Sequence, residues 1–565
     1  MSKMRFSATV SALALLVSGT GTWAQQVQVP SAGQATTATG TPYPEDQVPV
    51  TTPVQPEEAE EGEIVVTGLR RSLESAAAIK RNSDGIVDAI VAEDIGKLPD
   101  TFASSALARV TGVTVTRGGG ESAGVTVRGL PDISTTYNGR EIFTAEGRFV
   151  QIQDFPAGTV AALEVFKSSP ANLIEGGIGG QVNVRGRRPF DFRGFELSGS
   201  LNGVNWEQSG ELTWNGNLLV SNRWNTGIGE VGLLVNASYV GIDFLDSTRE
   251  QALVIGTTQP GQGVTPGVRF PDAQALFYGG GKRNRPSLNA AFQWRPTPEL
   301  EIYVDGLFQG FRSKDENRFL FVPIFGGLQL SNLVTQPGRP NQAQSFTVAN
   351  AVRPDGFYGS FNGNTDTYQA GGGAVWQRDG LTVSGDVAYT DSTFDYTLFN
   401  LDFAFANSPV RNVNFDAGKD GGATFDFVNF DETNPANFIS RGFYQEQLVV
   451  SGQDVQARAD VSYDMDWSFL KRIQVGVRFN DRDATRDFGN RYMPNEGARI
   501  PLSQLPVSLN LTNPGFDFGR AQPVRTFVAV PATSIRQNIG ALRTFFGLPA
   551  GLPPFNPTEN FTATE

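Results

Sequence analysis

The side chains that most enzymes use for catalysis are missing from this chain, because it contains no histidine and no cysteine. Without them the usual ligand sets for zinc, haem and iron–sulfur clusters cannot be assembled, and neither can a Ser-His-Asp or Cys-His catalytic centre. Carboxylates are the acid–base groups that remain readily available. The sequence therefore predicts no metal site, no cofactor and no enzymatic activity.

Two segments that suggest ligand binding have simpler interpretations. Gly118-Gly119-Gly120 joins two predicted strands, at 113–115 and 125–127, and lacks the following helix and lysine of a phosphate-binding loop. We interpret it as a turn. The acidic and aromatic segment from Phe415 to Asn434 does not fit the spacing of an EF-hand loop. It could stack on a sugar and hydrogen-bond it, or it could be a solvated loop, which we favour.

The first 24 residues have the features of a secretory signal peptide. Lys3 and Arg5 precede an apolar run from Ala8 to Val17, and Ala24 offers a small residue for cleavage. This run is about ten residues long, whereas a membrane-spanning helix needs about 20. We therefore predict a signal peptide over residues 1–24 and export of the mature chain beyond the inner membrane.

The mature chain has a β-type composition, with 64 Gly, 41 Phe and only 18% charged residues. Its formal net charge of −13 argues against nucleic acid as a partner, because phosphates call for a basic face. Residues 25–62 are rich in Gln, Thr and Pro and end in an acidic run, which predicts a disordered linker. The β-prone stretch Glu63–Gly68 follows it directly.

Residues 69–190 have the pattern of a small α/β domain. Asp100 can cap a short helix over 102–110, and Gly112 can end it. The two short strands on either side of the triple glycine follow this helix. We therefore predict a separate N-terminal folding unit before the β-rich remainder of the chain.

From residue 195 onward, apolar and polar residues alternate with a period of two. The pattern predicts strands near 195–206, 210–221, 228–243, 286–295, 299–312, 367–377, 381–392, 446–463 and 471–487. The links after the fourth, sixth and eighth strands are short, whereas those after the third, fifth and seventh run to roughly 40 to 55 residues. In a soluble sandwich, short and long loops would not be expected to alternate in this way. We therefore predict a membrane β-barrel over 195–565, with short periplasmic turns and long outer loops.

An odd number of strands leaves this barrel open. An unpaired edge in lipid costs several kcal/mol for each lost backbone hydrogen bond. The last six residues, Asn560–Glu565, also lack the terminal aromatic residue that such barrels usually carry. We therefore expect either that this is the N-terminal part of a longer polypeptide, or that the long loops contain further strands.

Six motifs follow one another between Glu63 and about Phe192, namely Glu63–Gly68, Ser105–Val115, Val125–Leu130, Asn138–Arg140, Leu163–Ser168 and Glu175–Asn183. In these residues and in their order, the segment resembles the TonB-dependent outer-membrane receptor family. One departure is Tyr137, which stands where the family commonly has Leu before Asn-Gly-Arg. The resemblance implies a 22-stranded barrel, here incomplete, with the N-terminal domain inside it as a plug.

The resemblance also implies partners and site residues. The TonB box, which binds the energy-transducing TonB–ExbB–ExbD complex, would be Glu63, Ile64, Val65, Val66, Thr67 and Gly68. Polar contacts that hold the plug in the barrel would come from Arg128, Arg140, Arg148, Glu164, Lys167 and Glu175.

The expected function is active uptake of a scarce solute across the outer membrane, with outer-membrane lipid around the barrel. The Glu175–Gly180 segment resembles receptors of the carbohydrate-associated branch, which favours an oligosaccharide over a ferric siderophore. A passive porin or an adhesin is the alternative, because either would share the alternation of the barrel strands.

Overall fold

The computed structural model of the chain describes most residues from 74 onward. The described residues are 74–91, 101–145, 150–252, 254–416, 418, 422–465, 467, 469–515, 519, 521–548 and 550–551. The predicted signal peptide, the linker and the segment Glu63–Gly68 lie outside them. No helix within these ranges is long and apolar enough to cross a membrane.

The first described part, residues 74–192, folds as the predicted small α/β domain, which begins with a helix at 74–82. Its further elements are β1 (Val87–Val91), α2 (Ala103–Leu107), β2 (Val113–Gly118), β3 (Glu121–Val127), β4 (Ile133–Tyr137), β5 (Arg140–Glu141), η1 (Ile152–Asp154), η2 (Ala157–Thr159), β6 (Val160–Phe166), β7 (Gly180–Gly186) and η3 (Pro189–Asp191). One sheet has the order β1-β6-β7-β4-β5, in which β4 and β7 run parallel and the other pairs antiparallel.

The helix predicted over 102–110 is shorter than expected. It runs from Ala103 to Leu107, and Phe102 occupies the N-cap without a side-chain hydrogen bond, whereas the predicted cap Asp100 lies outside the described residues. The Val110 N–H then bonds to the Leu107 carbonyl at 3.0 Å, which is a turn and not a further α-helical bond. The chain must turn here because β2 begins only three residues later.

The triple glycine is a turn, as predicted, and it joins the antiparallel strands β2 and β3. Gly119 and Gly120 have φ angles of +59° and +74°, which other residues adopt only with strain. The tip also packs closely against the rest of the chain. A Cβ atom on Gly119 would lie 2.5 Å from Nη1 of Arg283, and one on Gly120 would lie 2.9 Å from Cβ of Phe244.

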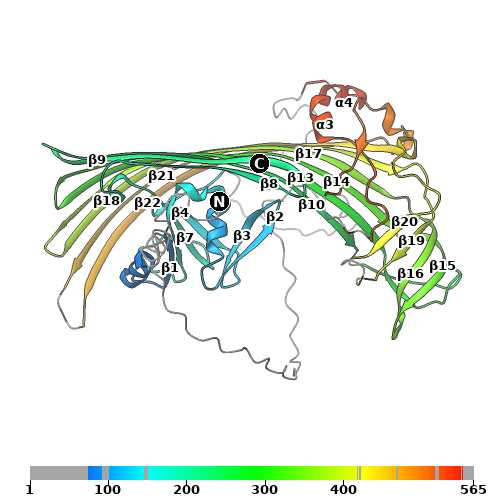
Figure 1. Cartoon of the computed structure of the whole chain (residues 1–565), viewed down its shortest axis with the longest axis horizontal. Coiled ribbons are helices and arrows are strands. Elements are labelled where there is room, and N and C mark those ends of the chain that lie inside the picture. The colour runs from blue at the N-terminus through cyan, green and yellow to red at the C-terminus, as the bar shows by residue number, and fades with distance from the viewer. Residues whose placement is uncertain are drawn as a thin grey trace, which may run out of the picture. The chain divides into compact units, whose positions relative to one another are not determined.

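Nine long antiparallel strands form a second, much larger sheet (Figure 1). They are β8 (Glu196–Trp206), β9 (Glu211–Thr226), β10 (Gly229–Gln251), β13 (Ala273–Thr297), β14 (Leu300–Pro323), β17 (Asp355–Arg378), β18 (Leu381–Phe405), β21 (Phe438–Asp464) and β22 (Arg472–Pro494). All nine predicted strands are confirmed, and they pair in chain order. Among the described residues β8 and β22 each have one neighbour, so this sheet is open, as the odd count predicts.

On the side of the long loops, the predicted strands are shorter than the observed strands. β13 begins at Ala273 instead of near 286, and β17 begins at Asp355 instead of near 367. The loops are therefore shorter than the predicted 40 to 55 residues. At these strand ends both faces carry apolar side chains, as in Leu320-Phe321-Val322, and the period-two signal disappears when both faces are apolar.

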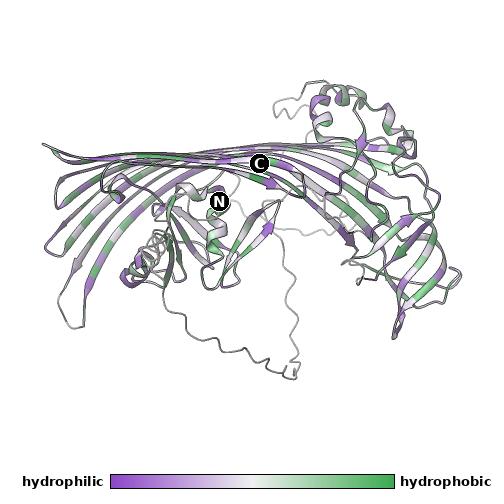
Figure 2. Cartoon of the chain, viewed as in Figure 1, coloured by the Kyte–Doolittle hydropathy of each residue, from purple (hydrophilic) through white to green (hydrophobic). Residues whose placement is uncertain are grey.

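The face of the large sheet that points away from the small domain, here called the outward face, carries an exposed apolar band. Figure 2 shows apolar and polar residues alternating along these strands. The band is bounded by aromatic residues on both sides. They are Trp224, Trp294, Trp376 and Tyr463 towards the short turns, and Tyr239, Tyr368 and Tyr389 towards the long loops.

Beyond this band the outward face is polar for several residues and then apolar again, but here it is covered. Tyr278 and Tyr358 are fully buried, and their hydroxyls donate to the carbonyls of Arg525 and Val528, each at 2.6 Å. The covering elements are β11 (Ile255–Thr257), β12 (Arg269–Pro271), β15 (Gly326–Gln336), β16 (Arg339–Ala351), β19 (Arg411–Asn414), β20 (Thr424–Phe427), β23 (Asn510–Leu511), β24 (Val528–Ala529), α3 (Ala532–Gln537) and α4 (Ile539–Phe545).

The long loops thus contain strands, as one of the two expectations allowed. β11, β12, β15, β16, β19 and β20 form a separate six-stranded sheet and do not close the large one. Phe415 and Phe425 of the segment 415–434 are buried in the core beneath this cover. The idea that these two rings stack on a sugar is therefore wrong.

Candidate functional site

The small domain contacts the large sheet mainly through charged and polar groups. Its own core is formed by its own side chains, and Leu307 is the one residue of the large sheet in that cluster. A second, small apolar cluster joins Phe102 to Val240, Ile242 and Phe244 of β10. Because side chains alternate along a strand, residues two apart on each strand share the inward face, which faces the small domain. Polar residues at these positions meet charged residues of the small domain in three clusters.

The first cluster is centred on Arg140, which lies in β5 and is 2% exposed. Its Nε and Nη2 atoms donate to the two carboxylate oxygens of Asp386 on β18, each at 2.8 Å, and Nη1 donates to Asp305 on β14 at 2.5 Å. Bidentate pairing of this kind fixes the orientation of a guanidinium as well as binding it. Arg188 donates to the other oxygen of Asp305 at 3.0 Å, and the Tyr303 hydroxyl donates to Asp386 at 2.8 Å.

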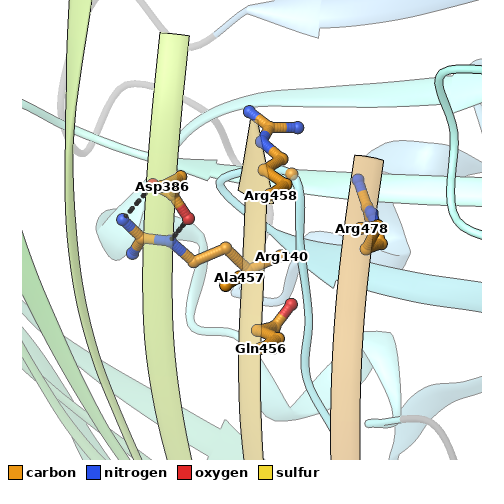
Figure 3. A pocket seen from close by; sticks show the side chains of 7 residues that line it. Arg140, Asp386, Gln456, Ala457, Arg458 and Arg478 are labelled. Atoms are coloured by element: carbon orange, nitrogen blue, oxygen red, sulfur yellow. Dashed lines mark hydrogen bonds and ion pairs between the residues drawn. The ribbon is translucent and has the colours of Figure 1, made fainter. Parts of the chain in front are cut away.

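This cluster depends on free space beside strand β17, which carries three successive glycines and so has no side chains there. A Cβ atom on Gly371 would lie 2.5 Å from the central carbon of the Arg140 guanidinium. Figure 3 shows Arg140 reaching across to Asp386, with Arg458 and Arg478 on the next two strands. These two arginines are directly opposite each other in the β21–β22 register.

Burial and ion pairing act on the charge of Arg140 in opposite directions. Burial lowers the pKa of this guanidinium, but the hydrogen bonds and charges of Asp386 and Asp305 outweigh it and raise the pKa above its usual value. Arg140 therefore remains charged. It balances one of the two buried carboxylates, and Arg188 balances the other.

The second cluster is centred on Glu121, the first residue of β3. Its two carboxylate oxygens form ion pairs with Arg283 and Arg285 of β13, each at 2.8 Å. Arg285 also pairs with Asp154 of η1 at 3.0 Å. Burial raises the pKa of the Asp154 carboxyl, and the adjacent Arg285 opposes this shift. This cluster holds the tip of the β2–β3 hairpin and the nearby 3-10 turn against the same strand.

The third cluster surrounds Glu141, next to Arg140 in β5. Its carboxylate pairs with Arg482 of β22 at 3.1 Å. Its backbone N–H donates to the Gln456 side chain at 2.9 Å, and its carbonyl accepts from Gln369 and Gln456 at 2.9 and 2.8 Å. Arg482 also lies over the ring of Phe143 at 4.4 Å. Strand β5 is thus bound to β14, β17, β18, β21 and β22.

The six residues expected to make polar contacts between the two parts have different positions. Arg140 contacts the large sheet, as described. Glu164 bonds to Asn183 and Arg185, and Lys167 donates to Asp88 and to the Thr111 carbonyl. These contacts are all within the small domain.

The other three expected residues are Arg128, Glu175 and Arg148. Arg128 is exposed, with φ +54°, and its side chain has no ion pair within the described ranges. Glu175 is exposed on the small domain. Arg148 and the segment Glu63–Gly68 lie outside the described residues.

The sequence analysis missed Glu121 and Glu141 in the small domain and every partner in the large sheet. One signal was present. Arg283, Asp305 and Asp386 are charged residues at the polar positions of otherwise alternating strands. Nothing local in the sequence indicates which of them pairs with Arg140, because Asp305 and Asp386 are 165 and 246 residues away from it.

Comparison with known proteins identifies the small domain. Residues 79–181 match the family model of the TonB-dependent Receptor Plug Domain. No curated protein is significantly similar to the chain in sequence.

Solved structures of receptors are similar to the chain at low scores. A variant of the ferric enterobactin receptor of Pseudomonas aeruginosa in complex with enterobactin has 12% identity and a TM-score of 0.30, with 72% of each chain covered. The ferric citrate transporter FecA has 11% identity and a TM-score of 0.27, covering 77% of this chain and 85% of its own. The siderophore receptor PiuA of Acinetobacter baumannii has 14% identity and a TM-score of 0.28, covering 73% and 62%.

Proposed function

We propose that this chain, which by its plug domain belongs to the TonB-dependent receptors of the outer membrane, takes up a scarce solute using energy from the TonB–ExbB–ExbD complex. The coupling to that complex, the identity of the solute and the absence of an enzymatic activity are all parts of this proposal. Among the described residues no cluster of three or more metal-binding side chains occurs, and the chain contains no histidine or cysteine.

One observation carries the proposal: the plug domain has its own core and meets the sheet mainly through ion pairs, with one small apolar contact at Phe102. An interface of this kind can exchange its contacts for water while the domain stays folded, whereas a shared apolar core would have to be exposed. Arg140 and Glu141 anchor β5, and Glu121 anchors the β2–β3 hairpin. A plug held in this way is suited to movement under an applied force.

The outward face of the large sheet supports a place in the membrane. Leu233, Val304 and Val387 are about half exposed, at 49%, 54% and 59%, on a band with no cover among the described residues. On β17 the aromatic residues that bound this band, Tyr368 and Trp376, are eight residues apart. That is about 26 Å along the strand, and a tilt of about 40° reduces it to about 20 Å. Outer-membrane barrels have an apolar band of about 25 Å with aromatic residues at both boundaries.

Coupling to the inner membrane would depend on Glu63–Gly68, the proposed TonB box. A β-prone segment on a disordered tether can add as a strand to the sheet edge of a partner, with main-chain hydrogen bonds supplying the affinity. In the plug domain the first strand after this segment is β1, at the edge of its sheet, where it pairs only with β6 in the described structure. A pull on the tether would reach the helix at 74–82 first and β1 next.

The favoured solute is an oligosaccharide, with a ferric siderophore next. The support is the similarity of the Glu175–Gly180 segment to receptors of the carbohydrate-associated branch. A passive porin or an adhesin is the second candidate, and the exposed apolar band and the strand alternation would suit it as well. A plug domain with an interface built from ion pairs favours the energised transporter.

Substitutions in the TonB box test the proposal. Proline at Val65 or Val66 removes a main-chain N–H donor, so strand addition to the partner is lost, whereas alanine at the same positions keeps the donor. We expect uptake in the proline variants, and in a variant lacking Glu63–Gly68, to fall to the level of a strain without TonB. The alanine variants should retain most of the rate. Uptake at the full rate after deletion of Glu63–Gly68 would contradict energised transport and favour a porin.

The solute itself can be identified by growth. A strain lacking the gene and its parent would be grown on a panel of oligosaccharides and of iron chelates as limiting nutrients. A growth defect on one or more oligosaccharides supports the favoured solute. A defect confined to iron chelates would replace it with a siderophore.

A further inference from the structure

The inward face of the large sheet continues beyond the plug domain and carries a band of aromatic rings. Gln369 of β17 and Ser392 of β18 bond to the plug domain and so mark the inward face. Side chains at even steps from them, and at the paired positions of the neighbouring strands, lie on the same face. Towards the long loops these positions hold what we call the aromatic belt: Phe277, Phe319, Phe321, Phe357, Phe361, Tyr396, Tyr444, Phe488 and Tyr492.

The rings of the belt are in contact across neighbouring strands. The ring centroids of Phe277 and Phe319 are 6.3 Å apart, and those of Phe319 and Phe357 are 5.5 Å apart. Phe361 and Tyr396 continue the series at 5.2 Å. At the same loop-side ends these strands also carry aromatic residues on their outward face, but those, such as Tyr278, Tyr358 and Phe403, are covered by the outer elements and fully buried. Most rings of the belt are only partly buried, and Tyr492 is 43% exposed.

A partly exposed row of phenylalanines is costly in water, because each ring leaves apolar area unburied. The same segments show that this chain can cover aromatic rings where stability requires it. The outward rings have a cover and most of the inward rings do not. A solute that enters from the outer side would meet the uncovered rings before it reached the plug domain.

Polar groups lie among the rings. The hydroxyls of Tyr396 and Tyr444 both donate to the carboxylate of Glu446, which is 5% exposed. Asp402, on the same face of β18, accepts a hydrogen bond from Tyr492. The guanidinium of Arg486 lies over the ring of Phe488 at 5.0 Å and is exposed. The wall therefore offers aromatic faces, two carboxylates and this guanidinium, without an excess of positive charge. An anionic iron chelate would call for a wall with net positive charge.

We propose that the aromatic belt is the binding wall for the transported solute and that this solute is a neutral glycan. The apolar faces of the sugar rings would stack on Phe319, Phe357 and Phe361, and their hydroxyls would bond to the exposed polar groups of Tyr492 and Arg486. This inference rests on the proposed transport function and specifies the wall that recognises the solute.

The test is binding by the full purified chain in detergent, measured by titration calorimetry with maltohexaose, cellohexaose, xylohexaose and ferric citrate as probes. The belt variants are Phe319→Leu and Phe357→Leu, which remove the ring but keep an apolar side chain. The matched control is Tyr368→Leu, because Tyr368 lies on β17 but on the outward face. We expect at least one hexasaccharide to bind, and each belt variant to weaken its affinity by about two- to tenfold. The control variant should bind as the parent does.

Three results would overturn the inference. They are no binding of any hexasaccharide, binding of ferric citrate alone, or equal affinity in parent and belt variants. Circular dichroism of each variant shows whether the sheet is intact, and a variant that misfolds is replaced by Phe361→Leu. If uptake depends on Glu63–Gly68 while the belt variants bind normally, the proposed role of the aromatic belt is wrong and the proposed transport function is supported. If hexasaccharides bind to the belt while deletion of Glu63–Gly68 leaves uptake unchanged, the proposed function fails instead.

Discussion

Replacing Arg140 with alanine should loosen the plug domain without unfolding the large sheet. The change leaves the carboxylates of Asp305 and Asp386, which are 5% and 8% exposed, without their shared guanidinium. Removing one partner of a buried ion pair typically costs about 3–5 kcal/mol. Here Asp305 keeps Arg188 and Asp386 keeps the Tyr303 hydroxyl, so we expect the lower end of this range, about 3 kcal/mol.

This cost is measurable as hydrogen exchange. At about 1.4 kcal/mol for each factor of ten, a loss of about 3 kcal/mol raises the population of the opened state roughly 100-fold. Amides of β4 and β5, from Ile133 to Glu141, should exchange faster by about this factor in Arg140→Ala, while those of β13 and β14 should not change.

Two further variants make the result decisive. Arg128→Ala removes an exposed arginine of the same domain that has no ion pair within the described ranges, and it should leave the exchange of β4 and β5 unchanged. Adding Asp386→Asn to Arg140→Ala removes the unpaired buried charge and should recover part of the loss, so the two changes should not be additive. The reasoning is refuted if Arg140→Ala accelerates exchange no more than Arg128→Ala does.

Three other changes have predictable results. Gly371→Ala should accelerate exchange in β5 as Arg140→Ala does, because its Cβ atom would lie 2.5 Å from the guanidinium carbon. Gly119→Ala should destabilise the β2–β3 hairpin by about 1–3 kcal/mol, because its φ is +59°. Gly118→Ala is the control, since nothing lies within 4 Å of the new Cβ atom, and it should be nearly neutral. The same exchange measurement compares the two variants. Asp88→Asn should lower plug stability at pH 7 by less than about 1 kcal/mol, and the effect should disappear only at a pH well below about 4. The hydrogen bonds from its two lysine partners lower the pKa of Asp88. The contribution of Asp88 to the free energy of unfolding is therefore present above the unfolded pKa and is lost as the pH falls through the lower, folded pKa. Denaturation of the variant and the parent at pH 7 and at the low pH checks this.

The strands of the large sheet could be predicted because one face is apolar and the other polar over most of their length. The prediction failed where this difference disappears. At the loop-side ends both faces carry aromatic residues, one face buried under the outer elements and the other forming the aromatic belt, so Phe319, Phe321 and Phe357 were assigned to loops. A period of two cannot be detected when both faces are apolar. The covering sheet was missed for another reason, because four of its six strands have only three or four residues and the strands pair across three different loops.

The site was predicted in part. Arg140 was identified from its motif, but its partners are far away in sequence, and only pairing of the strands in the correct register brings Asp305 and Asp386 to the same place. Glu164 and Lys167 come from equally recognisable motifs, yet their contacts are within the plug domain. A motif identifies a residue that matters for the domain without showing whether it faces inward or outward.

One signal for the interface was present in the sequence. Glycine within a strand weakens it, so three successive glycines in β17 have a cost in stability that needs a structural reason. The register places Gly371 beside Asp305, and an arginine side chain from another domain occupies the space that a side chain there would fill. Gly452 provides a similar space, because a Cβ atom there would lie 2.8 Å from the ring of Phe143. Gly371 and Gly452 therefore mark places where the plug domain approaches the wall, whereas the space at other inward glycines, such as Gly363, is filled by side chains of the sheet itself, so a glycine alone does not locate the interface.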